Sequence, residues 1–155
     1  MKRIALLSAC LAPFSLAACG QAPKPQSGPP SAVGVFTSAQ DCAASEKLKL
    51  AECSALLLQA MYLHQQGQKT YTSQRLCEVA EGPDQCERAE NNSFRRRLLA
   101  FQVTFSSPPA SAPLYAPKEK GVIGFSTLDT TKTLLAIDET LIFSSDAKFV
   151  AEGIN

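Results

Sequence analysis

The arrangement of cysteines constrains the fold of this chain more than any other feature. Residues 36–53 and 71–86 run in the same order: an aromatic residue, Thr-Ser, three residues, a cysteine, a variable insert and a second cysteine. Four cysteines allow three pairings, and spacing alone does not choose among them. If the two segments are versions of one structural unit, the simplest pairing joins the two cysteines within each unit. The repeat therefore predicts two disulfides, Cys42 to Cys53 and Cys77 to Cys86.

Loop entropy and helix signals agree with this pairing. Loops of this size each stabilise a fold by about 2.7 kcal/mol, and a longer crossed loop would add only about 1 kcal/mol. Thr-Ser is a helix N-cap signal, which places Cys42 and Cys77 in the first turns of short helices. Gly82 and Pro83 then end the second helix and turn the chain back toward Cys86.

Metal binding and redox chemistry fit these cysteines less well. Zinc sites usually show close CxxC or CxxxH spacing, and His64 is the only histidine. Catalytic dithiols are typically CxxC pairs with a thiolate at a helix N-terminus, which neither spacing matches. We therefore predict no metal and no cofactor.

Residues 1–18 have the layout of a secretory signal, with Lys2 and Arg3 before a short apolar run. The run ends in Leu-Ala-Ala and Cys19, which resembles the lipobox of bacterial lipoproteins, whose cysteine is acylated before cleavage. An ordinary signal peptide cut nearby, with Cys19 as a stray thiol, is the alternative. Gly20 and Gln21 follow where retention in the inner membrane usually needs Asp. The resemblance therefore implies a lipid anchor in the cell outer membrane.

The remaining chain divides into a tether and a domain. Residues 19–35 are rich in Pro, Gly, Ser and Gln and predict an extended linker behind the lipid. Residues 36–155 then form a single small disulfide-stapled domain, which is typical of exported proteins. Without Lys2 and Arg3 the 15 basic residues fall to 13, against 14 acidic ones. This neutral balance argues against nucleic acid as a partner.

The longest helix is predicted over residues 50–68, where apolar residues fall on overlapping helical faces until Gly67. We expect its leucine-rich face to be core and His64 to lie at the surface or in a cap. Residues 98–105 alternate apolar and polar side chains, which indicates a strand. The same residues also fit the end of a helix that starts at Ser93.

The C-terminal third is predicted to be β-structure. Its β-branched and aromatic runs, bounded by turn residues, cover residues 122–128, 133–138 and 140–149. The predicted fold class is therefore α+β: a small disulfide-stapled helical N-terminal half followed by a small antiparallel β meander.

Several motifs together resemble the YgiB-type lipoproteins, a poorly characterised group of proteobacterial envelope proteins linked to biofilm formation. They are the signal with its lipobox, "AECSALLLQAMY" (51–62), "YTSQRLCEVAEGPDQC" (71–86) and "PLYAPKEKGVIGFSTLDTTKT" (113–133). The chain departs from that pattern by lacking its Gly- and Met-rich middle and its Gly-, Ser- and Arg-rich tail. The resemblance implies an envelope lipoprotein and supplies no catalytic residues.

The expected function is a non-enzymatic binding or structural role in the cell envelope, with a biofilm link, facing the periplasm. The partner would be an unknown envelope protein or glycan, besides the membrane itself. The sequence has no Gly-rich phosphate loop, GxSxG or HExxH motif. One alternative is a periplasmic enzyme, or an enzyme inhibitor, with acid and base groups such as Asp129, Asp138 and Glu139. Another is a surface-exposed adhesion or matrix factor.

The predicted contact surface combines a basic run with an aromatic residue, namely Arg95, Arg96, Arg97 and Tyr115. Three adjacent arginines cannot all lie on one strand face, so at least one faces solvent or a partner. Such a run could bind the head groups of phospholipid or lipopolysaccharide. An ordinary solvated face is the alternative.

Overall fold

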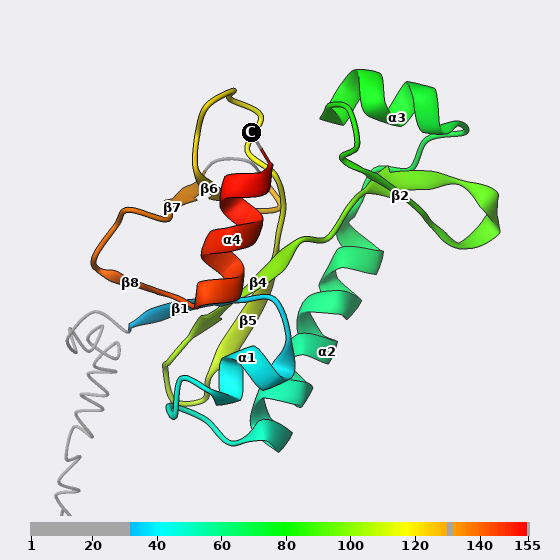
Figure 1. Cartoon of the computed structure of the whole chain (residues 1–155). Coiled ribbons are helices and arrows are strands. Elements are labelled where there is room, and N and C mark those ends of the chain that lie inside the picture. Colours follow the sequence, from blue (N-terminus) through cyan, green and yellow to red (C-terminus); the bar gives the residue numbers. More distant parts are fainter. Residues whose placement is uncertain (1–31, 130–131, 155) are drawn as a thin grey trace, which may run out of the picture.

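The computed structural model describes residues 32–129 and 132–154 (Figure 1). The predicted signal peptide, Cys19 and residues 19–31 of the tether lie outside them. The main sheet has four strands in the order β5-β4-β1-β8. Strand β1 pairs antiparallel with β4 and parallel with β8, the last strand within the described residues. The strands are β1 (Val33–Phe36), β4 (Ala100–Thr104), β5 (Ala110–Leu114) and β8 (Leu141–Phe143).

Helices cover both faces of this sheet (Figure 1). On one face, α1 (Ala39–Ala43) and α2 (Leu50–Gly67) pack on the buried rings of Phe36 and Phe101. On the other face, α4 (Ser145–Gly153) packs with a second core that includes Val35, Leu114, Phe125, Leu134, Ala147 and Ala151. Since successive β1 residues point to opposite faces, Val35 and Phe36 belong to different cores. Each large side chain buried in this way stabilises the fold by about 2 kcal/mol.

The two short helices begin at the predicted serine caps. Ser38 Oγ accepts a hydrogen bond from the Asp41 amide at 3.0 Å. At the start of α3 (Gln74–Glu81), Ser73 Oγ accepts one from the Leu76 amide at 3.3 Å. Gly82 follows α3 with a φ of 114°, which a side chain would disfavour.

Both disulfides join neighbouring elements, and they are the pairs that the sequence repeat predicts. Cys42 to Cys53 connects α1 to α2, with their Cα atoms 5.9 Å apart. Cys77 to Cys86 connects α3 to β2 (Cys86–Arg88) across a Cα distance of 6.2 Å. The second disulfide therefore fixes the loop of residues 82–85 against the end of α3.

Two hairpins complete the fold. Strands β2 and β3 (Phe94–Arg96) pair antiparallel on either side of the short 3-10 helix η1 (Glu90–Asn92). Strands β6 (Gly124–Ser126) and β7 (Thr133–Leu135) form the other hairpin. A Cβ atom at Gly124 would lie 2.2 Å from the carbonyl oxygen of Leu134, so this pairing requires glycine.

The predicted α+β class is confirmed, with helices and two disulfides first and antiparallel strands after them. The long helix, its end at Gly67 and the strand within residues 98–105 are also confirmed. The alternative helix from Ser93 is wrong, because β3 and β4 occupy that segment.

Two details of the strand prediction differ from the structure. The run 140–149 is strand only as far as Phe143, because Ser144 Oγ accepts from the Ala147 amide and starts α4. Strand β8 pairs with β1 instead of extending the β6–β7 hairpin. Strand β1 also starts at Val33, within the predicted tether of residues 19–35.

Candidate functional site

Arg96 is the centre of a buried polar network between the helical half and β6. Its side chain is only 4% exposed. Its Nη2 donates to Ser126 Oγ at 2.7 Å and to the Ala116 carbonyl. Its Nε lies 3.7 Å from Glu81 Oε2, and its guanidinium carbon lies 4.7 Å from the centroid of the Tyr115 ring. Ala116 and Ser126 lie at the two ends of the segment 117–125. The hydrogen bonds from Arg96 therefore fix both ends of that segment.

His64 and Glu87 form the adjoining part of this network. His64 Nε2 lies 2.8 Å from Glu87 Oε1, and Nδ1 lies 3.1 Å from the Tyr115 hydroxyl. Arg95 Nε donates to the same Glu87 oxygen at 2.9 Å. Burial alone would raise the pKa of Glu87, but the hydrogen bonds from His64 and Arg95 lower it below its usual 4.5. Glu87 therefore holds α2 and β3 together as an ionised acceptor.

Two tyrosines of this region are strong candidates for hydrogen-bond donors, not for nucleophiles. Burial raises the pKa of Tyr115 to about 12. Burial, together with the hydrogen bond from its hydroxyl to Glu81 Oε1 at 2.7 Å, raises the pKa of Tyr71 to about 12 as well. Both hydroxyls therefore keep their protons at neutral pH.

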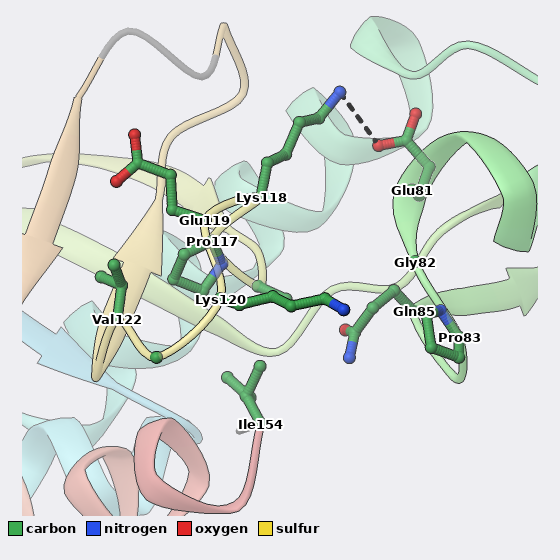
Figure 2. Close-up of a pocket in the computed structure, with 12 residues that line it drawn as sticks. Glu81, Gly82, Pro83, Gln85, Pro117, Lys118, Glu119, Lys120, Val122 and Ile154 are labelled. Atoms are coloured by element: carbon green, nitrogen blue, oxygen red, sulfur yellow. Dashed lines mark ion pairs between the residues drawn. The ribbon is translucent and has the colours of Figure 1, made fainter.

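A groove with a volume of about 440 Å³ opens beside the network (Figure 2). Residues 81–85, at the end of α3 and in its exit loop, form one wall, and the loop of residues 116–122 forms the other. Ile154, just after α4, lies between the two walls. The apolar lining of the groove comes from Pro83, Pro117, Val122 and Ile154. A cavity of this size is typical of sites for small molecules.

Two lysines of the second wall differ in their environment. Lys118 Nζ lies 3.6 Å from Glu81 Oε2, so the polar network holds it at the rim. Lys120 extends across the groove toward Gln85, whereas Glu119 points to the other side of the loop (Figure 2). Among residues 32–129 and 132–154, no carboxylate forms an ion pair with Lys120. Lys120 is therefore available to an anionic group in the groove.

Gln85 gives the groove a second polar feature. Its Oε1 is buried and accepts no hydrogen bond from any part of the chain that the structure describes. Buried polar atoms almost always have a partner. Gln85 lines the groove and its side chain points toward Lys120, but its Oε1 is closed to solvent (Figure 2).

The groove continues into a second hollow of about 510 Å³, which shares Pro83, Gln85 and Ile154 with the first. The second hollow adds the apolar side chains of Leu99 and Phe149 and the exposed cation Arg97. We refer to both parts together as the exit-loop groove. Its lining combines apolar side chains with the cations Lys120 and Arg97.

The predicted contact surface is divided by the structure. Arg97 is exposed and lines the exit-loop groove, where its Nη2 donates to the Asp84 carbonyl. Arg95 is half-buried against Glu87. The prediction that Arg96 and Tyr115 are exposed is wrong, because both are buried. Alternation along β3 turns Arg96 inward, and Tyr115 is bridged to β6 through its backbone.

His64 is also buried, which corrects the expectation that it lies at the surface or in a cap. The sequence held a signal for this, because His64 continues the helical spacing of Cys53, Leu56 and Ala60, which are all buried. No comparable signal identified the groove. Its walls meet only through contacts between distant parts of the chain.

Residues 32–129 and 132–154 contain no cluster of three or more His, Cys, Asp or Glu side chains that could hold a metal ion. Asp129, Asp138 and Glu139 are exposed and lie outside the exit-loop groove. Hydrogen bonds from Thr140 lower the pKa of Asp138. The structure therefore does not bring these three carboxylates into the groove.

Similarity to known proteins places the chain in a family. No curated protein and no solved structure matches the chain. Residues 30–121 match the family described as "Protein of unknown function (DUF1190)". The matched segment is more than half of the chain and includes both disulfides, Arg96, Tyr115 and the loop that carries Lys120. On this match, the chain belongs to the DUF1190 family of proteins of unknown function.

Proposed function

We propose that this protein is a lipoprotein of the cell envelope that binds a small amphiphilic anion in the exit-loop groove and catalyses no reaction. Cys19 would carry the lipid anchor in the outer membrane, with the domain facing the periplasm. The lipobox and the order of motifs support this location. We also propose that the likeness to YgiB-type lipoproteins, with their biofilm link, is a true relationship. An envelope protein or glycan as partner stays a prediction.

The observation that carries the proposal is the position of Lys120. Its side chain extends across a groove whose other lining is largely apolar (Figure 2). A ligand with an apolar body and a carboxylate or phosphate would satisfy the cation and cover the apolar walls at once. Pockets that combine apolar walls with a few polar groups are typical ligand sites.

The polar network supports a binding role more than a catalytic one. His64, Glu87 and Tyr115 are the one hydrogen-bonded set that resembles catalytic machinery in the described residues. His64 and Tyr115 are buried, and burial keeps the Tyr115 hydroxyl protonated. A general base must come within hydrogen-bond reach of the substrate, which this burial opposes. The network instead supports the loop that presents Lys120.

Binding can be tested with two amphiphiles of equal chain length and opposite charge. The protein would be secreted behind an ordinary cleavable signal with Cys19→Ser, and titrated calorimetrically with dodecanoate and with dodecyltrimethylammonium. We expect dodecanoate to bind in preference to the cation. Lys120→Gln should weaken dodecanoate binding about tenfold, because it removes a charge-assisted hydrogen bond.

Lys132→Gln provides the matched control, since Lys132 is also exposed but does not line the exit-loop groove. This variant should bind dodecanoate like the parent protein. Equal affinity for the two amphiphiles, or equal losses in the two lysine variants, would refute a site specific for anions. The anchor is tested separately: Cys19→Ala in the native precursor should block processing or release the protein from membranes.

A further inference from the structure

The outward side of α2 is apolar although it faces solvent. Leu58 and Tyr62 are 65% and 61% exposed, and Met61 is also exposed. Ala51, Ala55, Leu58 and Tyr62 follow one another at spacings of four, three and four residues, so they share one face of the helix. We call these four residues and Met61 the α2 outer face.

This face reverses the usual pattern of a surface helix. The opposite side of α2 is already in the core through Cys53, Leu56 and Ala60. Surface helices normally carry charged residues opposite their buried side, and helices that are apolar all round are normally covered. Between Glu52 and Gly67 there is no Asp, Glu, Lys or Arg, and the one histidine, His64, is buried. The α2 outer face is therefore suited to a contact.

Lysines lie in the chain just before and just after α2. Lys47 and Lys49 precede the helix, Lys69 follows it with its Nζ 5.1 Å from the centroid of the Tyr71 ring, and all three are exposed. The nearest acidic group on the helix, Glu52, is turned back to accept a hydrogen bond from the Lys49 amide at 2.8 Å. Apolar helices that lie on membranes commonly carry lysines whose amines reach the head groups, and tyrosine favours the same interface.

The size of the face argues against a second copy of the chain as its partner. With 18 residues, α2 is about 27 Å long and about 10 Å wide, a footprint of about 270 Å². Stable protein interfaces bury about 800 Å² on each partner. Binding of this face to a membrane requires a smaller intrinsic affinity, because the lipid anchor already holds the chain close to the membrane. The 13 peptide units from Cys19 to Ala32 reach at most about 45 Å.

We propose that the α2 outer face lies on the surface of the membrane to which the chain is anchored, with Leu58, Met61 and Tyr62 at the boundary between head groups and acyl chains. The inference rests on the lipid anchor of the proposed function, and it does not depend on the ligand of the exit-loop groove. Both lie on the same domain, so the membrane contact would also fix how the groove is oriented.

The absence of tryptophan from the chain allows a direct test. Tyr62→Trp places a single fluorophore on the α2 outer face. Ile137→Trp is the matched control, because Ile137 is 80% exposed in the turn before β8, at the other edge of the sheet from β5 and α2. Each lipidated protein would be purified from membranes and reconstituted into vesicles of phosphatidylethanolamine and phosphatidylglycerol, with and without brominated acyl chains.

We expect both proteins to float with the vesicles, and Tyr62→Trp alone to shift its emission to the blue and lose most of its fluorescence to the brominated lipid. If both proteins float and are quenched equally, or are not quenched at all, the proposed orientation is wrong. The lipid anchor would still be supported by the flotation. A blue shift without quenching overturns the orientation too, and indicates that protein covers the face. Failure to float overturns the anchor and this inference together.

Discussion

Arg96 and Arg97 are neighbours in the chain, but only Arg96 is enclosed by protein. Its guanidinium binds Ala116 and Ser126 and lies beside Glu81. Removal of one member of a buried ionic network leaves the others without compensation, which costs more than the loss of an exposed charge. The two side chains therefore differ in energetic role although their chemistry is the same.

We predict that Arg96→Met lowers the free energy of unfolding by about 3 kcal/mol, since it removes the buried hydrogen bonds to Ser126 and the Ala116 carbonyl and the buried cation beside Glu81. Arg97→Met should change it by less than about 0.5 kcal/mol, because Arg97 is exposed. Urea titration followed by circular dichroism measures both values. Similar losses in the two variants would contradict the structural role given to Arg96.

At the scale of elements, the two disulfides have equal covalent chemistry but different neighbourhoods. The loop closed by Cys77 and Cys86 contains residues 81–85, which form a wall of the exit-loop groove. Neither Cys42 nor Cys53 lines the groove, and both belong to the core between α1 and α2. The two repeated segments therefore each contain a disulfide, but only the Cys77–Cys86 disulfide lies beside the candidate site.

The secreted form with Cys77→Ser and Cys86→Ser should lose about 2 to 3 kcal/mol of stability, and so should the form with Cys42→Ser and Cys53→Ser. Only the first pair of substitutions should also weaken dodecanoate binding, because it releases the wall of residues 81–85. Denaturation and calorimetry on the same samples separate the two effects. Equal loss of binding in both would indicate a general effect of destabilisation.

The elements that could be predicted from the sequence are those that local chemistry specifies. Ser38 and Ser73 cap their helices, and Gly82 ends α3, as their residue types suggest. Strand β1 could not be predicted, because its four residues are held by partners far away in the sequence. The same reason applies to Arg96 and Tyr115, whose burial depends on the contact between β3 and the loop before β6.

At the scale of the whole molecule, the segment that matches the family is not a structural unit. Residues 30–121 end before β6, β7, β8 and α4. The missing part supplies Phe125, Leu134 and Ala147 to the second core and Ser126 to the buried network. The core on one face of the sheet therefore depends on residues beyond the family match.

We predict that a secreted fragment of residues 30–121 does not fold cooperatively, whereas residues 30–155 do. The fragment would expose Val35 and Leu114 to water, at a cost of about 2 kcal/mol for each large side chain left unburied. Thermal melting followed by circular dichroism compares the two proteins. A sigmoidal transition in the shorter protein would show that the second core is dispensable.

The parallel pairing of β1 with β8 also sets a time order for folding. Ribosomes make the chain from its N-terminus, so Val33–Phe36 is synthesised more than a hundred residues before Leu141–Phe143. One edge of β1 keeps unpaired amides and carbonyls until Leu141–Phe143 has been made. Contacts between such distant segments slow folding, and open strand edges favour association with other chains. Residues 141–143 therefore determine how long one edge of β1 stays open to other chains.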